Sequence, residues 1–361
     1  MDNPIHQLSR QLRLRTLPLG LFLFGSAVAG CSGSEVSIGS GQQPVEVPEG
    51  LCGDGTWQGN VVAGRQEQIE ALRGCTEITG DLTLRPFAEM DLTPLSELRI
   101  VRGDLEVGEA SPGVDVSGRM TSLAGLESLE QVNSLSLRGV MASDLSALAN
   151  LRRINVDPLG PHTDGGMFEI FSCDELVDLG GLDALADFAD ISVSGNARLN
   201  SLSGPHFPPR MRRISLAGGV LTDLSALGAV RTVDTFEVQQ NTSIQHLDGL
   251  ALENVGVLAL IMNDGLQQVD SLSSLESLEN FLVARNPRLE RLPSLDGVDF
   301  VKMVTVVDNA ELRNVPTFSG GLGESFWLGA YRSSGADFGP EFASFDVFDV
   351  GDNPKLARID A

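Results

Sequence analysis

The feature that most constrains this chain is a short pattern, built around an asparagine, that returns at nearly constant spacing. It reads apolar, any, apolar, two of any, Asn, two of any, Leu, two of any, apolar, and it centres on Asn196, Asn241, Asn263, Asn286, Asn309 and Asn353. Successive positions are 22 or 23 residues apart when Gly219 and Tyr331 are counted in the asparagine place. Repetition at this period indicates a solenoid, in which stacked neighbours bury a core that no single unit can bury alone.

The same position continues towards the N-terminus, where it is filled by Phe87, Ala110, Val140 and Cys173. The chain therefore holds about twelve coils. Residues five and three places before the asparagine are apolar and alternate as a strand does, so we expect them to point inward and the residue between them to point outward. The sequence predicts a right-handed β-helix solenoid with a parallel sheet, coils of 22–23 residues and few helices.

An inward asparagine at every turn has a physical reason. Its amide has two donors and two acceptor lone pairs, so it can pair loop backbone groups that would otherwise be buried without a partner. We therefore expect the six asparagines to form a structural ladder. Cys173, in the same place, is interpreted as a buried, weakly hydrogen-bonding apolar residue rather than a nucleophile. The triplet at Asn241, "NTS", is interpreted as ladder rather than as a glycosylation acceptor.

The first fifty residues have a different composition. Three arginines precede an apolar run at 17–24 that is too short to span a bilayer, and the small residues "GSAVAG" lead to Cys31. The letters "VAGC" resemble the lipobox of bacterial lipoproteins, so residues 1–30 are predicted to be a lipoprotein signal peptide and Cys31 the lipidated residue. An ordinary signal peptide is the alternative. Residues 31–50 are predicted to be a flexible Gly/Ser/Pro tether. The protein is expected to be exported and held at the bacterial outer membrane or cell surface through its lipid.

The charge of the chain limits its partners. The formal net charge is −24 and the pI is about 4.4, and lysine occurs only at Lys302 and Lys355. This balance argues against nucleic-acid binding and against a polybasic membrane patch. Because a solenoid adds coils without a second core, residues 51–361 are predicted to be one elongated domain.

Export would place Cys52 and Cys75 in an oxidising compartment, where they can pair and seal the first end of the stack. The segment 51–84 resembles the opening of the receptor L domain, the leucine-rich ligand-binding domain of insulin and EGF receptor ectodomains. The matching residues are Cys52, Gly53, Leu72, Cys75, Thr76, Ile78 and Gly80. The family's first disulfide carries over onto Cys52 and Cys75, and its repeated turn is similar to the asparagine ladder. The family is also related to leucine-rich repeats.

The resemblance has limits. Receptor L domains have about half as many coils and close their far end with further cysteines, and their Cys-rich modules, transmembrane helix and kinase have no counterpart here. The resemblance therefore implies a fold and a habit of binding proteins, but not receptor signalling.

The outward positions of the strands suggest where a partner would bind. They are polar in the early coils and become apolar in the later ones, where Ala259, Ile261, Leu282, Ala284, Val307 and Trp327 follow in register. Met303 and Val257 lie one step further out on the same face. An apolar patch on a solvated sheet is typical of an interface. The alternative is that another segment or a second copy covers this strip as ordinary core. Two coils are also longer than the rest, at 110–119 and 157–166, and such insertions often carry binding.

The sequence offers little for catalysis. Its four histidines are not spaced for a metal site, and it has no GxSxG, Walker or GxGxxG motif, so no metal and no cofactor is expected. We predict non-catalytic recognition or adhesion, with a protein or glycan bound on the sheet face. A passive structural envelope protein is one alternative. An exported polysaccharide-degrading β-helix enzyme is a weaker one, because it would need basic and acidic groups clustered at one level of the sheet.

Overall fold

A computed structural model describes residues 52, 54–85, 89–108, 120–155, 166–313 and 321–329, the last range by its backbone alone. The predicted signal peptide and tether, Cys31, both insertions except Gly166, and Asn353 lie outside these residues.

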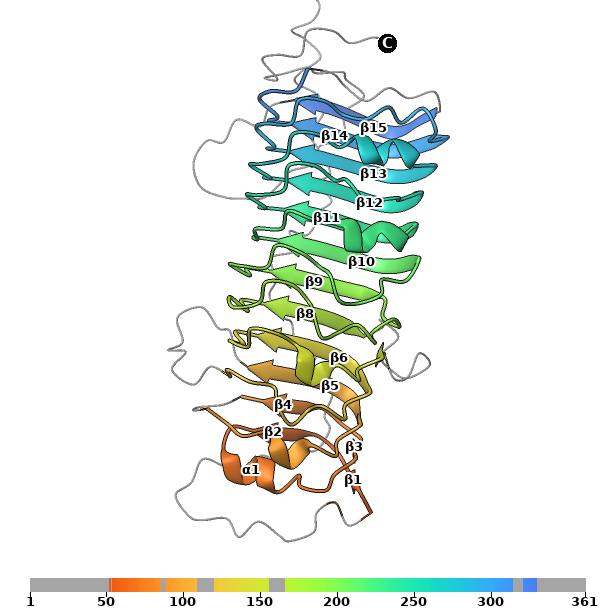
Figure 1. The fold of residues 1–361 in the computed structure, drawn as a ribbon. Coiled ribbons are helices and arrows are strands. Elements are labelled where there is room, and N and C mark those ends of the chain that lie inside the picture. The colour runs from red at the N-terminus through yellow and green to blue at the C-terminus, as the bar shows by residue number, and fades with distance from the viewer. Residues whose placement is uncertain are drawn as a thin grey trace, which may run out of the picture.

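The described strands form one sheet in which every pairing is parallel. The strands are β1 (Thr56–Trp57), β2 (Val61–Ala63), β3 (Glu77–Ile78), β4 (Leu82–Leu84), β5 (Ile100–Gly108), β6 (Gln131–Arg138), β7 (Arg153–Ile154), β8 (Met167–Phe171), β9 (Asp190–Ser194), β10 (Arg210–Ala217), β11 (Thr232–Gln239), β12 (Asn254–Ile261), β13 (Ser277–Ala284), β14 (Phe300–Val307) and β15 (Gly321–Gly329). From β8 onward each strand lies beside the next one in the chain, as Figure 1 shows. The predicted solenoid with a parallel sheet is confirmed, and each predicted coil from Phe87 to Tyr331 contributes a strand.

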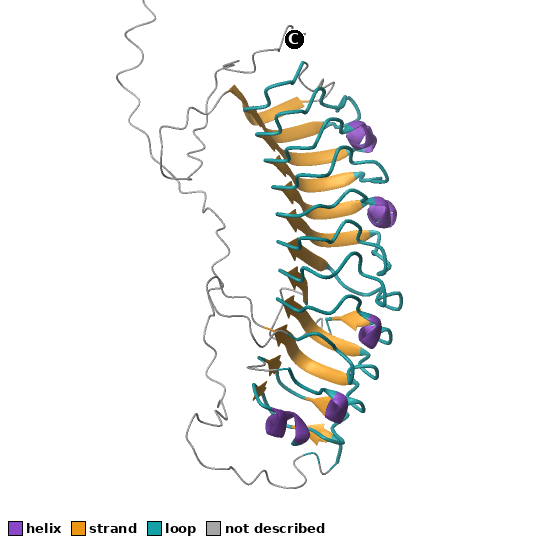
Figure 2. Ribbon diagram, turned by 60° about the vertical axis from the view of Figure 1, so that its left-hand side comes forward, coloured by secondary structure: helices purple, strands orange, loops and turns teal. Residues whose placement is uncertain are grey.

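The 3-10 turns lie on the side of the stack away from the sheet (Figure 2). Among the described residues they are η3 (Thr93–Leu95), η4 (Ser146–Leu148), η5 (Ser225–Ala229) and η6 (Asp270–Ser274). The α-helix α1 (Gln66–Glu70) lies at the N-terminal end of the stack (Figure 1). In a 3-10 turn, side chains three apart point the same way, so Leu145 and Leu148 are both buried at η4. Asp144 fixes the start of that turn because its Oδ1 accepts the Ser146 amide at 3.0 Å.

The core consists of columns of side chains that run along the stack. The column five residues before the ladder position contains Leu82, Leu105, Leu135, Phe168, Ile191, Ile214, Phe236, Leu258, Phe281 and Val304, all buried. The register explains the columns, since Phe236 pairs with Leu258 and Leu258 with Phe281. These residues point inward, as the sequence predicts.

The ladder asparagines are also inside. Asn196, Asn241, Asn263, Asn286 and Asn309 are at most 1% exposed. The Oδ1 of Asn309 accepts the backbone amide of Asn286 at 2.9 Å, and the Oδ1 of Asn286 accepts that of Asn263 at 3.0 Å. The Nδ2 groups of Asn196, Asn263, Asn286 and Asn309 donate back to a strand carbonyl, for example from Asn286 to Leu260 at 2.9 Å. The side chains therefore link successive coils by hydrogen bonds inside the protein.

The ladder is interrupted at Gly219, which has no side chain to continue it. The Oδ1 of Asn241 turns instead to its own loop and accepts the Ser243 and Ile244 amides, both at 3.0 Å. A cavity of about 10 Å³ lies between Asn196, Gly219 and Asn241. That volume is about the size of one water molecule.

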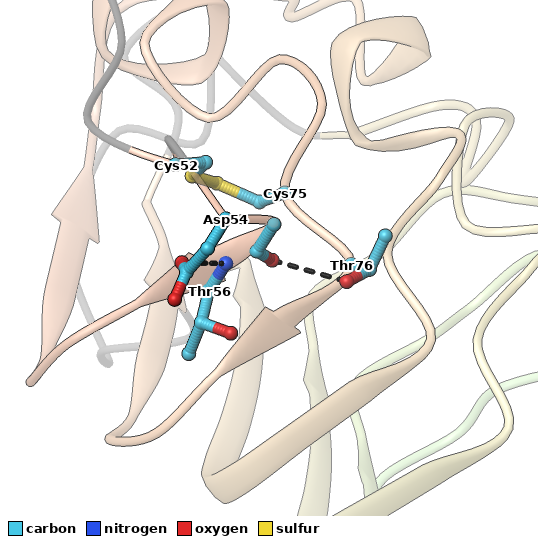
Figure 3. Close-up of a disulfide and its surroundings, with 6 residues drawn as sticks. Cys52, Asp54, Thr56, Cys75 and Thr76 are labelled. Atoms are coloured by element: carbon cyan, nitrogen blue, oxygen red, sulfur yellow. Dashed lines mark hydrogen bonds between the residues drawn. A yellow bond between two sulfur atoms is a disulfide. The ribbon is translucent and has the colours of Figure 1, made fainter.

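The N-terminal end of the stack is closed by a cap that holds a disulfide between Cys52 and Cys75, whose Cα atoms are 5.2 Å apart. Figure 3 shows two hydrogen bonds that fix the backbone beside it: the Thr56 amide donates to Asp54 and the Thr76 hydroxyl donates to the Gly55 carbonyl, both at 3.1 Å. The strand β2 pairs with β4 and adds a partial turn ahead of the predicted coils.

Among the described residues, the helices are all too short or too polar to cross a membrane.

Candidate functional site

The outward face of the later strands carries four half-exposed apolar side chains: Val257 and Ile261 on β12, Leu282 on β13 and Met303 on β14. The register pairs Leu282 with Ala259 and Thr305, and it pairs Ile261 with Ala284. Ile261, Leu282 and Met303 therefore lie on a diagonal across consecutive strands. Diagonal neighbours on a sheet are about 7–8 Å apart, within reach of long side chains. We call Ile261, Leu282 and Met303 the apolar diagonal.

Other predicted members of the strip differ from these three. Val307 is only 7% exposed, so the expectation that it contributes exposed surface is wrong for this residue. Ala259 and Ala284, in register with Leu282 and Ile261, are buried too, at 5% and 9%. Trp327 lies on β15, paired with Thr305, and its side chain is outside the described part of the structure. The apolar diagonal is therefore narrower than the predicted strip.

The same face of the early coils is mostly polar, with half-exposed apolar side chains at Met167 and Phe171 on β8. Arg85 pairs with Glu106 at 3.2 Å, and Arg138 pairs with Glu169 at 2.7 Å, each between strands. The Ser136 hydroxyl also donates to Glu169 at 2.6 Å. These two cross-strand pairs neutralise the charges of the four side chains that form them.

Glu237 on β11 stands at the boundary between the polar and apolar parts, in register with Ser215 on one side and Ala259 on the other. Burial raises the pKa of Glu237, against the opposing effects of a hydrogen bond from the Ser215 hydroxyl and the positive charge of Arg213. A half-buried carboxylate at the edge of an apolar surface favours a partner that brings a positive charge to it.

Residues in the ladder are structural. Burial raises the pKa of the Cys173 thiol to about 12, so it is protonated at neutral pH and a poor nucleophile. Its backbone amide donates to the Oδ1 of Asn196 at 2.8 Å. The Asn241 amide is buried, which makes it inaccessible to glycosylation. Among the described residues, no group of His, Cys, Asp and Glu side chains is arranged to hold a metal ion.

A second column, formed by the residue immediately before each ladder position, was not expected from the sequence. Its backbone is left-handed, with φ of 53° to 56° at Ser172, Gln240, Met262, Arg285 and Asp308. Three other coils have glycine there, at Gly139, Gly195 and Gly218. This conformation costs roughly 1–2 kcal/mol for a residue with a Cβ and nothing comparable for glycine. The later coils thus keep side chains where glycine would fit without strain.

Comparisons with known proteins identify no family for the chain. No protein-family model matches it, and no curated protein matches it. Among solved structures it is similar to an internalin from Listeria monocytogenes, with 18% sequence identity, a TM-score of 0.24, and coverage of 68% of this chain and 78% of that one. A likeness this remote carries no information about the function of this chain.

Proposed function

We propose that the protein recognises another protein, without catalysis, through the apolar diagonal. The observation that carries this proposal is the half-exposure of Ile261, Leu282 and Met303 on adjacent strands, beyond early coils whose face carries cross-strand ion pairs. Half-exposed apolar side chains gain free energy when a partner removes them from water. Such a cluster within a polar surround is the usual composition of an interface centre.

The charges around the apolar diagonal indicate the partner's chemistry. Glu237 is half-buried at one border of the diagonal, and Glu279 is exposed next to β13's apolar positions. The chain as a whole has a net charge of −24. A partner with an apolar patch bordered by Arg or Lys would complement this surface and be attracted to it over a distance.

Several sequence features support a place of action at the cell envelope. The signal-like residues 1–30, the lipobox-like Cys31 and the Cys52–Cys75 disulfide support export to the bacterial cell envelope, with the lipid as anchor and 31–50 as tether. The similarity of 51–84 to the receptor L domain supports protein binding rather than catalysis. On the early strands, Glu106 and Glu169 are paired with Arg85 and Arg138, and such paired carboxylates are less suited to acid–base work on a polysaccharide.

The test compares cell-surface capture by the full chain with capture by the double variant Leu282→Lys, Met303→Lys. Both side chains point outward, so the variant keeps the core intact while it places two positive charges on the diagonal, where they would repel a basic partner. Ser194→Lys is the matched control, because it adds a positive charge at an outward position of β9. We expect the double variant to lose a basic partner that the wild-type chain and the control retain. Equal recovery of every partner by all three proteins would contradict the proposal and favour a passive envelope protein.

A further inference from the structure

An open pocket of about 460 Å³ lies at the edge of the sheet where β11 to β14 end. One wall consists of the left-handed residues Gln240, Met262, Arg285 and Asp308, and the other of Thr242, Asp264 and Pro287. Each wall takes one residue from each successive coil, so the pocket runs along the axis of the stack. Its volume is in the range of ligand sites in proteins.

The polar groups of the pocket include both donors and acceptors. The Gln240 amide offers both, the Thr242 hydroxyl offers both, and the Asp264 carboxylate accepts. All three side chains are exposed. A ligand with hydroxyl groups, each of which can donate and accept, would match this mixture better than a ligand with acceptors alone.

The charged side chains that line the pocket disfavour an anionic ligand. Arg285 pairs with Asp308 through its Nε at 3.5 Å, so the positive charge in the pocket is matched by a carboxylate. Asp264 adds a further negative charge on the opposite wall. A phosphate or a carboxylate would therefore meet a net negative surface, and a neutral ligand would not.

The pocket also has apolar surface. Met262 and Pro287 both line the pocket, Met262 half-exposed and Pro287 exposed. These groups can pack against the C–H face of a sugar ring while its hydroxyl edge meets the polar side chains. A mostly apolar small molecule fits less well, because a shallow pocket that is open to solvent would leave much of its surface wet.

We propose that this pocket binds a neutral oligosaccharide, with the sugar chain lying along the axis of the stack. The coils repeat at about 4.8 Å, so successive sugar units would meet equivalent positions on successive coils. The left-handed backbone supports this assignment. Gln240, Met262 and Arg285 hold side chains in a conformation that glycine adopts freely, and those side chains build the wall of the pocket.

This inference is independent of the proposed protein partner. Met262 follows Ile261 in the chain, but β-strand side chains at the apolar diagonal face outward from the sheet, whereas the pocket lies past the strand ends. Variants in one surface leave the side chains of the other unchanged, so the two proposals can fail separately.

The experiment measures binding to the full chain by titration calorimetry. The probes are three neutral hexasaccharides (cellohexaose, chitohexaose and maltohexaose) and one basic peptide, hexalysine. The test variant is Gln240→Gly with Asp264→Ala. Glycine suits the left-handed conformation at position 240, where φ is 53°, so this variant is expected to fold. Asp248→Ala, an exposed carboxylate in a turn outside the pocket, is the matched control.

We expect at least one hexasaccharide to bind the wild-type chain and the control saturably, and to bind the double variant more weakly by a factor of roughly ten or more. Melting temperatures within error of one another would show that all three proteins are folded. The proposal is overturned if none of the sugars binds at millimolar concentration, if the double variant binds as well as wild type, or if only hexalysine binds.

Discussion

At the residue scale, the ladder requires one asparagine side chain at the same position of each coil. Asn263, Asn286 and Asn309 have Oδ1 or amide groups within hydrogen-bonding distance of the next coil, between 2.9 and 3.2 Å. The inward position of these residues was predictable, because the period of the pattern identifies the buried side of each strand. The hydrogen-bond partners of these side chains were not predictable. Asn241 occupies the same position in its coil, yet its Oδ1 accepts hydrogen bonds from its own loop.

Gly219 offers a direct test of the ladder. Its φ is not positive, and a Cβ there would have only the Ala217 carbonyl oxygen near it, at 3.9 Å. Gly219→Asn should therefore fit and supply an oxygen to the Asn196 coil. We expect the free energy of unfolding to rise by about 1 kcal/mol, from one added hydrogen bond and a less flexible unfolded chain. Urea denaturation measures the change.

The neighbouring Gly218 is the control for that substitution. Its φ is 57°, so Gly218→Asn would place a Cβ in the left-handed conformation without adding a ladder group. We expect it to be neutral or destabilising. If both variants change stability equally, the gain at Gly219 does not come from the ladder.

Glu237 should make stability depend on pH. Burial raises its folded-state pKa, so the folded protein binds the proton more tightly than the unfolded chain does, and stability falls as pH rises through the folded pKa. Glu237→Gln removes this penalty. We expect the variant to melt at a higher temperature than wild type at pH 7, and the two melting temperatures to converge below the ordinary glutamate pKa. A difference that stays constant with pH would contradict the assignment.

At the element scale, exposure was the property that the pattern predicted least well. Alternation correctly placed Leu282 and Val307 on the outward face, yet Leu282 is half-exposed and Val307 is buried. Exposure depends on what the neighbouring strands carry, which a pattern within one coil does not include. The left-handed column was missed for a similar reason, since Gln240 and Met262 give no local sign of a positive φ.

The disulfide cap is an element whose contribution can be measured. Cys52 and Cys75 close a loop with a sequence separation of 23, worth on the order of 3 kcal/mol by the chain-entropy estimate. We expect reduction to lower the urea midpoint of the wild-type chain. Cys52→Ala with Cys75→Ala should show the lower midpoint with or without reductant. A wild-type midpoint that does not respond to reductant would mean that the bond does not stabilise this end.

At the scale of the whole molecule, each coil contacts mainly its neighbours, which makes the fold nearly one-dimensional. Its architecture was predictable because the same sequence pattern recurs in successive coils. The binding surfaces were less predictable from the sequence. The apolar diagonal and the pocket each combine residues from several coils, so the pattern within one coil does not reveal them.

A whole-coil deletion tests this architecture. Removing residues 264–286, which are 23 residues from one ladder position to the next, would set β12 against β14 and Asn263 next to Asn309. We expect a folded chain with a cooperative melt. Removing residues 264–274 alone would break the register and should prevent native stacking there. Equal behaviour of the two deletions, judged by circular dichroism and melting, would contradict a coil-by-coil solenoid.

Hydrogen exchange at the ladder amides tests the central claim most directly, namely that equivalent side chains stack into internal columns. The backbone amides of Asn241, Asn263 and Asn286 each donate to the asparagine oxygen of the next coil, at 2.9 to 3.1 Å. The stacked fold predicts that these three amides exchange as slowly as the central strand amides of β12 and β13. Exchange as fast as that of the exposed turn residues Asp248 and Gly249 would show that the columns do not exist.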